Sequence, residues 1–92
     1  MLKLRPTKKY KKDRKLMKKQ GKNLSLLDEV IEKLQNHETL DAKYHDHPLR
    51  GNYVRFRECH IEPDWLFIYG IDNDKLILTA SRTGSHSNLL KM

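Results

Sequence analysis

Residues 53–78 read YVRFRECHIEPDWLFIYGIDNDKLIL, and this stretch decides the fold. Two turn signals, Glu62-Pro63 and Asp72-Asn73-Asp74, divide it into three apolar segments of strand length. The unbroken apolar run in the middle segment suits a central strand that is covered on both faces. The sequence therefore predicts an antiparallel meander with strands at 53–61, 65–69 and 76–78.

Helical spacing dominates the chain before this meander. Tyr10 and Met17 lie two turns apart in a lysine-rich segment that Gly21 ends. A second helix follows, with Asn23 or Ser25 as its cap and an apolar face formed by Leu24, Leu27, Ile31 and Leu34. In the manner of a capping box, Asp28 stands three residues after Ser25. We expect a helix hairpin that covers the sheet, and a short edge strand at Leu2–Leu4.

Length and charge limit the classes of protein to consider. Ninety-two residues, of which 37% are hydrophobic, suffice for one domain spanning 1–92 and exclude a two-domain arrangement. The net charge is +7, and residues 1–22 hold 11 Lys and Arg with one acidic residue. Nine of the fifteen residues from Lys8 to Lys22 are basic, which fits either a solvated helix face or a surface that contacts phosphates. Polyanions are the expected partners.

The sequence shows no sign of a membrane or an export route. Its apolar runs fall short of the roughly 18 to 20 residues of a membrane span, and residues 1–6 lack the apolar run of a signal peptide. We expect a cytoplasmic protein with no membrane partner. The single cysteine, Cys59, cannot form an internal disulfide and is expected to be a buried, inert thiol.

Histidines and one aspartate mark the places where the predicted strands end. His47 lies in a turn-rich loop, and His60 and Asp64 flank the tight connection between two strands, which we expect to bring them opposite each other. Gly84 permits a turn that brings His86 back over the sheet. We therefore expect these side chains to face one site.

Three interpretations of this cluster stay open. Each histidine can be an ordinary surface residue. A metal site is the second interpretation, with ligands from His45, His47, His60, Asp64 and His86, although the spacing matches no established metal motif. The third is metal-free acid–base catalysis beside a basic surface, which is what cleavage of RNA by its own 2′-hydroxyl requires. Trp65 can stack on a base or belong to the core.

Three pieces of the sequence resemble one family when they are taken together: Asp46-His47-Pro48-Leu49-Arg50-Gly51, Phe56-Arg57-Glu58-Cys59-His60-Ile61-Glu62-Pro63-Asp64-Trp65 and Arg82-Thr83-Gly84-Ser85-His86. In order and spacing they are similar to the YafQ branch of the RelE/ParE superfamily of bacterial toxins. The resemblance covers nearly the whole chain. It implies an α+β fold in which an N-terminal helix hairpin packs on a four-stranded, mainly antiparallel sheet. It also implies a type II toxin that cuts messenger RNA on the translating ribosome.

The resemblance also implies roles for residues. Catalysis falls to His47, His60, Asp64 and His86, and substrate contact to Trp65 and Arg82. We favour His86 as the general acid and His47 or His60, positioned by Asp64, as the base, with no metal or cofactor. One position departs from the family: Leu90 stands where the YafQ pattern has a phenylalanine, and leucine cannot stack on a nucleobase. This departure bears on substrate preference or rate.

Partners and alternatives follow from the same residues. The resemblance implies a cognate acidic antitoxin, through which alone the chain would meet operator DNA, together with messenger RNA and the ribosome. Lys11, Lys15 and Lys18 of the basic helix are expected to contact 16S ribosomal RNA. A gyrase inhibitor of the ParE kind would share the fold but needs no histidines, and a non-catalytic RNA-binding module would need only the basic helix.

Overall fold

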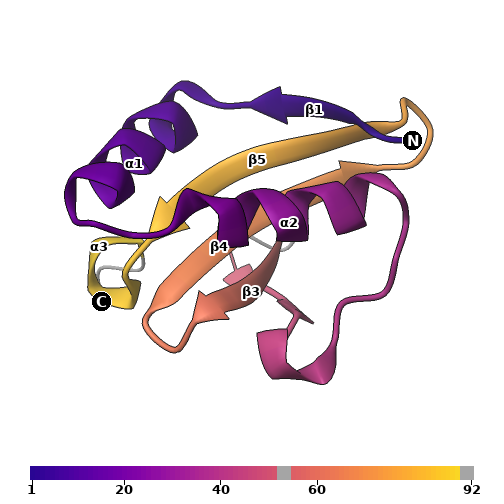
Figure 1. Cartoon of the computed structure of the whole chain (residues 1–92). Coiled ribbons are helices and arrows are strands. Elements are labelled where there is room, and N and C mark those ends of the chain that lie inside the picture. Colours follow the sequence, from indigo (N-terminus) through magenta and orange to yellow (C-terminus); the bar gives the residue numbers. More distant parts are fainter. Residues whose placement is uncertain (52–54, 90–92) are drawn as a thin grey trace.

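The computed structural model of the chain describes residues 1–51 and 55–89 (Figure 1). Within these ranges it forms one five-stranded sheet with the strand order β1-β5-β4-β3-β2. The strands are β1 (Lys3–Pro6), β2 (His47–Pro48), β3 (Arg57–Glu62), β4 (Trp65–Asp72) and β5 (Ile77–Gly84). The helices are α1 (Lys8–Lys19), α2 (Leu24–Gln35), the 3-10 helix η1 (Ala42–Tyr44) and the short α3 (His86–Leu89).

Strands β3, β4 and β5 form the predicted antiparallel meander, and β1 is the predicted edge strand, paired in parallel with β5. The sheet has five strands and not four, because two residues of the predicted loop pair with β3 as β2. Strand β5 runs to Gly84, well past the predicted end at Leu78, because its second half continues to pair with β4. The predicted start of the first strand falls at residues 53–54, outside the described residues.

Helices α1 and α2 cover one face of the sheet (Figure 1). From the sheet, the core on this face includes Cys59, Trp65, Phe67 and Tyr69, all essentially fully buried. From the helices it includes Tyr10, Met17, Leu27, Val30, Ile31 and Leu34. The predicted apolar faces of both helices are thus confirmed, and each large apolar side chain in this layer stabilises the fold by about 1.5 to 3 kcal/mol.

The caps of the two helices differ partly from the prediction. The Thr7 hydroxyl accepts a hydrogen bond from the Tyr10 amide at 3.0 Å, and so caps α1. The side chain of Asn23 accepts from the Ser25 amide at 3.1 Å and caps α2, so the predicted capping box is wrong. Asp28 is engaged elsewhere: its carboxylate binds the Arg14 guanidinium at 2.7 and 2.9 Å and ties α2 to α1.

The opposite face of the sheet, which we call the site face, carries a smaller apolar cluster. Leu66 and Ile68 of β4 are buried there under Leu89 of α3, with Leu49 and Phe56 alongside. Strand β4 is therefore covered on both faces, as its apolar run predicts. Among the described residues, no helix is both long and apolar enough to cross a bilayer.

Candidate active site

Backbone register brings the sequence-predicted residues to neighbouring positions on the sheet. Two rows of paired residues cross it: one is His47, Glu58, Ile68 and Arg82, and the other is His60, Leu66 and Gly84. Directly paired residues of neighbouring strands share a face, and side chains two apart on one strand do so as well. Glu58 and His60 therefore lie on the site face with Leu66 and Ile68.

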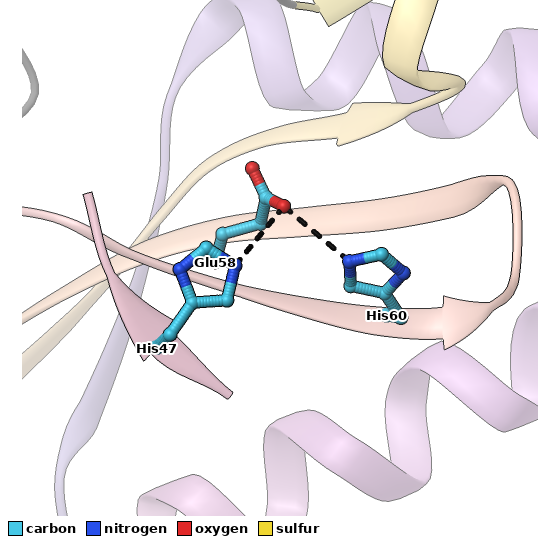
Figure 2. A group of neighbouring side chains, drawn as sticks. All are labelled: His47, Glu58 and His60. Atoms are coloured by element: carbon cyan, nitrogen blue, oxygen red, sulfur yellow. Dashed lines mark ion pairs between the residues drawn. The ribbon is translucent and has the colours of Figure 1, made fainter. Parts of the chain in front are cut away.

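A buried carboxylate joins two of the predicted histidines (Figure 2). Glu58 Oε1 lies 3.4 Å from His47 Nε2 and 3.5 Å from His60 Nε2. The Glu58 side chain is only 3% exposed, whereas His47 is 48% exposed and His60 25%. One carboxylate oxygen thus lies beside two imidazoles whose outer parts reach solvent, which is the arrangement expected of positioned proton-transfer groups.

Glu58 was not among the residues predicted from the sequence, and it has a further property. Its second oxygen, Oε2, is buried and has no hydrogen-bond partner among the described residues. A signal for Glu58 does exist in the sequence, since it stands two residues before His60 on a predicted strand and so shares its face. What the sequence could not show is the pairing of β2 that places His47 directly opposite Glu58.

The loop that carries His47 is fastened by its preceding residue. Asp46 Oδ1 accepts hydrogen bonds from the Tyr69 hydroxyl at 2.5 Å and from Arg57 Nε at 3.3 Å, and Asp46 Oδ2 accepts from the other end of the guanidinium at 3.3 Å. Burial, and then the bond to Asp46, raise the pKa of Tyr69. The same carboxylate raises the pKa of Arg57. Tyr69 thus stays a neutral donor, and Asp46 fixes the position at which β2 begins.

His86 lies on the site face, at the start of α3 and exposed to solvent. Leu89 of the same short helix packs on Leu66 and Ile68 and so docks α3 onto this face. Gly84, two residues before His86, stands in the row of His60 with Leu66 between them. Two strand spacings separate this row's ends by about 10 Å. Helix α3, which carries His86, therefore packs over Leu66, between the strand of His60 and that of Gly84.

Two of the predicted site residues lie elsewhere. Asp64 is exposed in the β3–β4 turn, and the register pairs His60 with Leu66, so the expected opposition of His60 and Asp64 is wrong. Trp65 is fully buried on the helix-covered face, where its indole donates to the Thr83 hydroxyl at 2.9 Å. Its predicted stacking on a nucleobase is wrong, because the ring is enclosed by the core.

Of the positively charged residues predicted to contact RNA, Arg82 is paired with a carboxylate and the three lysines are exposed. Arg82 binds the carboxylate of Asp13 at 2.7 and 3.2 Å, and so links β5 to α1. Lys11, Lys15 and Lys18 are all exposed on α1. Leu90, at the position where the YafQ pattern has a phenylalanine, lies outside the described residues.

The same three side chains at the centre of the site form a candidate metal-binding group. Ligand atoms from His47, Glu58 and His60 all lie within 4.8 Å of one another. Two imidazole nitrogens and a carboxylate oxygen suit a divalent transition metal, and Glu58 Oε2, which has no hydrogen-bond partner in the described part of the chain, adds an acceptor. His45, one of the metal ligands considered from the sequence, contacts His60 edge to face with ring centroids 5.6 Å apart. Asp64 and His86 are not in this group.

Comparison with known proteins identifies the family. A family model described as the bacterial toxin of a type II toxin–antitoxin system, YafQ, matches residues 2–91. The chain belongs to the YafQ family. It is 43% identical over 81 residues to the mRNA interferase toxin YafQ of Escherichia coli K12, a match covering 87% of this chain and 86% of that protein.

Solved structures of YafQ-family and related toxins share the whole fold. A metal-bound toxin from Helicobacter pylori superposes with a TM-score of 0.92 at 43% identity, covering 98% of this chain and 100% of the other. The toxin from the E. coli DinJ–YafQ toxin–antitoxin complex superposes with a TM-score of 0.88 at 36% identity, covering 97% of each chain. The expected membership of the YafQ branch and the α+β fold are confirmed.

Proposed function

We propose that this YafQ-family toxin is an mRNA interferase, an endoribonuclease that cuts messenger RNA on the ribosome in the cytoplasm. The observation that carries the proposal is the trio of His47, Glu58 and His60, in which a buried carboxylate holds two solvent-reaching imidazoles. Its 43% identity to a protein named as an mRNA interferase supports the same activity. A gyrase inhibitor has no need of this arrangement, and neither has a module that only binds RNA.

The proposed reaction uses the RNA's own 2′-hydroxyl as the nucleophile. His47 or His60 takes the 2′-hydroxyl proton as the oxygen attacks the neighbouring phosphorus, and the bond to the 5′-oxygen breaks. His86, at the start of α3, gives its proton to the leaving 5′-oxygen. The products are a 2′,3′-cyclic phosphate and a 5′-hydroxyl, so no water and no metal enters the step.

Glu58 acts in this scheme as a positioning residue. It holds the Nε2 atoms of both imidazoles and stabilises whichever of them becomes positively charged. His47 Nδ1 lies 3.2 Å from the carbonyl oxygen of Pro48, to which it can only donate, so His60 is the better placed of the two rings to take the proton. The orienting role expected of Asp64 thus passes to Glu58, and Asp64, exposed beside the strand of His60, is proposed to meet the substrate. Arg82 is proposed to contact phosphate beside its bond to Asp13.

Single alanine variants of His47, His60 and His86 test the proposal. Each should slow cleavage of ribosome-bound messenger RNA by roughly 10²- to 10⁴-fold, as expected when a proton-transfer group is lost. His37→Ala is the matched control, because His37 is also exposed but lies outside the site. If all three variants cleaved at the rate of the His37 variant, the nuclease site would be wrongly placed.

The same function implies protein partners. Because YafQ of E. coli has been crystallised with DinJ as a toxin–antitoxin complex, we propose that this chain binds a cognate acidic antitoxin. The +7 net charge favours association with an acidic chain. Contact with operator DNA is proposed to occur only through that antitoxin.

We propose metal binding as a second role of the same trio, with an inhibitory effect. Its support is the buried, unpartnered Glu58 Oε2 beside two imidazoles, and the metal-bound state of the related H. pylori toxin. A divalent ion bound between His47, Glu58 and His60 would place two positive charges beside both rings and so hinder their uptake of a proton. Calorimetric titration with Zn²⁺ should give one site that Glu58→Gln weakens at least about tenfold. Equal Zn²⁺ affinity in both proteins would contradict this role, and a chelator should not slow RNA cleavage.

A further inference from the structure

A cavity of about 580 Å³ opens beside His60, and apart from that histidine its lining takes no part in the proposed reaction. It lies between the start of α2, helix η1 and the end of β3. Leu26 and Ile61 give it apolar walls, while Lys43 and Glu62 bring one charge of each sign. Its size and mixture of apolar and polar lining are typical of a site for a small planar ligand.

His60 belongs to this cavity and to the catalytic trio at once. Its Nε2 atom faces Glu58 at 3.5 Å, and the residue also lines the cavity. A phosphate undergoing cleavage at His60 is therefore next to the cavity mouth. The base of the nucleotide attached to that phosphate can therefore reach into the cavity.

His45 supplies an aromatic surface at the same place. Its side chain is exposed, lines the cavity and contacts the His60 ring edge to face, with an interplanar angle of 67°. Its backbone adopts the left-handed conformation, with φ of 47° and ψ of 44°, which is unusual for a residue with a side chain. Such conformations gather at functional sites, and imidazole rings are among the side chains on which unpaired bases stack.

We propose that this cavity binds the nucleobase next to the scissile phosphate, with His45 as the stacking surface and Glu62 as an acceptor. The proposal rests on the proposed nuclease function. Glu62 Oε1 is paired with Lys22 Nζ at 3.3 Å, and the carboxylate has a second oxygen to accept from an exocyclic amino group. Adenine, guanine and cytosine carry that group and uracil does not. The cavity should therefore select against uracil.

The stacking role is tested with ribosomes that carry messenger RNAs differing only in the bases beside the mapped cut. His45→Ala should raise KM by about 5- to 150-fold, the range expected for one lost base–aromatic stack, with a much smaller fall in kcat. His45→Phe should restore most of the loss. His37→Ala is a close control, since His37 is another exposed histidine with positive φ, at 60°. Equal KM values for the two alanine variants would overturn the proposal.

The acceptor role is tested separately with Glu62→Gln. Because an amide can also donate to the uracil carbonyl, this variant should cut RNAs with uracil at that position several-fold better relative to the other bases. An unchanged base preference would overturn the role of Glu62. If wild-type protein cut no RNA at all, the proposed function itself would fail. If the wild-type protein cut RNA, but His45→Ala left KM unchanged and Glu62→Gln left the base preference unchanged, only the proposed role of the cavity would be refuted.

Discussion

At Glu58 a carboxylate that is 3% exposed has one oxygen between two imidazoles and the other without a hydrogen-bond partner among the described residues. Leaving a buried polar atom unsatisfied costs about 1 to 3 kcal/mol, and more when the group is charged. The fold tolerates this cost at the centre of the site face. Such a local loss of stability is expected at a position where function, and not stability, determines which residue is present.

Replacing Glu58 by glutamine should separate stability from activity. The neutral isostere removes the charge that holds His47 and His60, so we expect cleavage to slow by about 10- to 100-fold. Because a neutral amide costs less to bury than a carboxylate, the melting temperature should rise. Glu38→Gln, at an exposed position, is the control. A variant with lower melting temperature and full activity would show that Glu58 serves the fold alone.

Cys59 gives a second test at the level of one residue. It is completely buried, and desolvation raises the pKa of its thiol far above the ordinary value. Only the thiolate reacts, so the folded protein should resist a maleimide reagent at pH 8 and become labelled only in denaturant. Mass spectrometry measures the labelled fraction. Labelling of folded protein at the rate of a free cysteine would contradict the packing of β3 against the helices.

At the scale of elements, the loop leading into β2 depends on Asp46. Its bonds to Tyr69 and Arg57 should contribute about 1 to 3 kcal/mol, and they set the place of His47 opposite Glu58. We expect Asp46→Ala to lower the unfolding free energy by that amount and also to slow cleavage. Tyr69→Phe, which removes one of the bonds, should have a smaller effect on both. Urea unfolding and cleavage rates give the two values, and unchanged cleavage in Asp46→Ala would show that β2 does not need this anchor.

Elements whose pattern is local could be predicted from the sequence, and those made by distant pairing could not. Helix α2 and strand β4 follow from periodicity and from an unbroken apolar run. Strand β2 has two residues and exists only because β3 pairs with it. The site divides in the same way: the family motifs point to His47, His60 and His86, but the role of Glu58 depends on register. Trp65 shows the converse error, since an aromatic beside a motif can belong to the core.

For the molecule as a whole, the lysine-rich helix and the trio of His47, Glu58 and His60 lie on different sides of the sheet. Helix α1 covers one face of the sheet (Figure 1), whereas the strand register places Glu58 and His60 on the other face. Changing Lys11, Lys15 and Lys18 to Glu should therefore leave catalytic groups and melting temperature nearly unchanged. It should weaken ribosome binding and flatten its dependence on salt by roughly 2 to 3 units of logarithmic slope. Lys75→Glu, in the β4–β5 turn, is the control, and wild-type affinity at low salt in the triple variant would make α1 a merely solvated face.

The chemical identity of the new RNA ends tests the function of the whole molecule most directly, because it depends on the reaction mechanism. Purified protein is incubated with ribosomes carrying a defined messenger RNA, and the new termini are identified by enzymatic treatment and denaturing gels. Attack by the 2′-hydroxyl must leave a 2′,3′-cyclic phosphate and a 5′-hydroxyl, and His86→Ala must lose nearly all of this product while staying folded. Termini with a 3′-hydroxyl and a 5′-phosphate, or no cleavage by the wild-type protein, would contradict a histidine-based mRNA interferase.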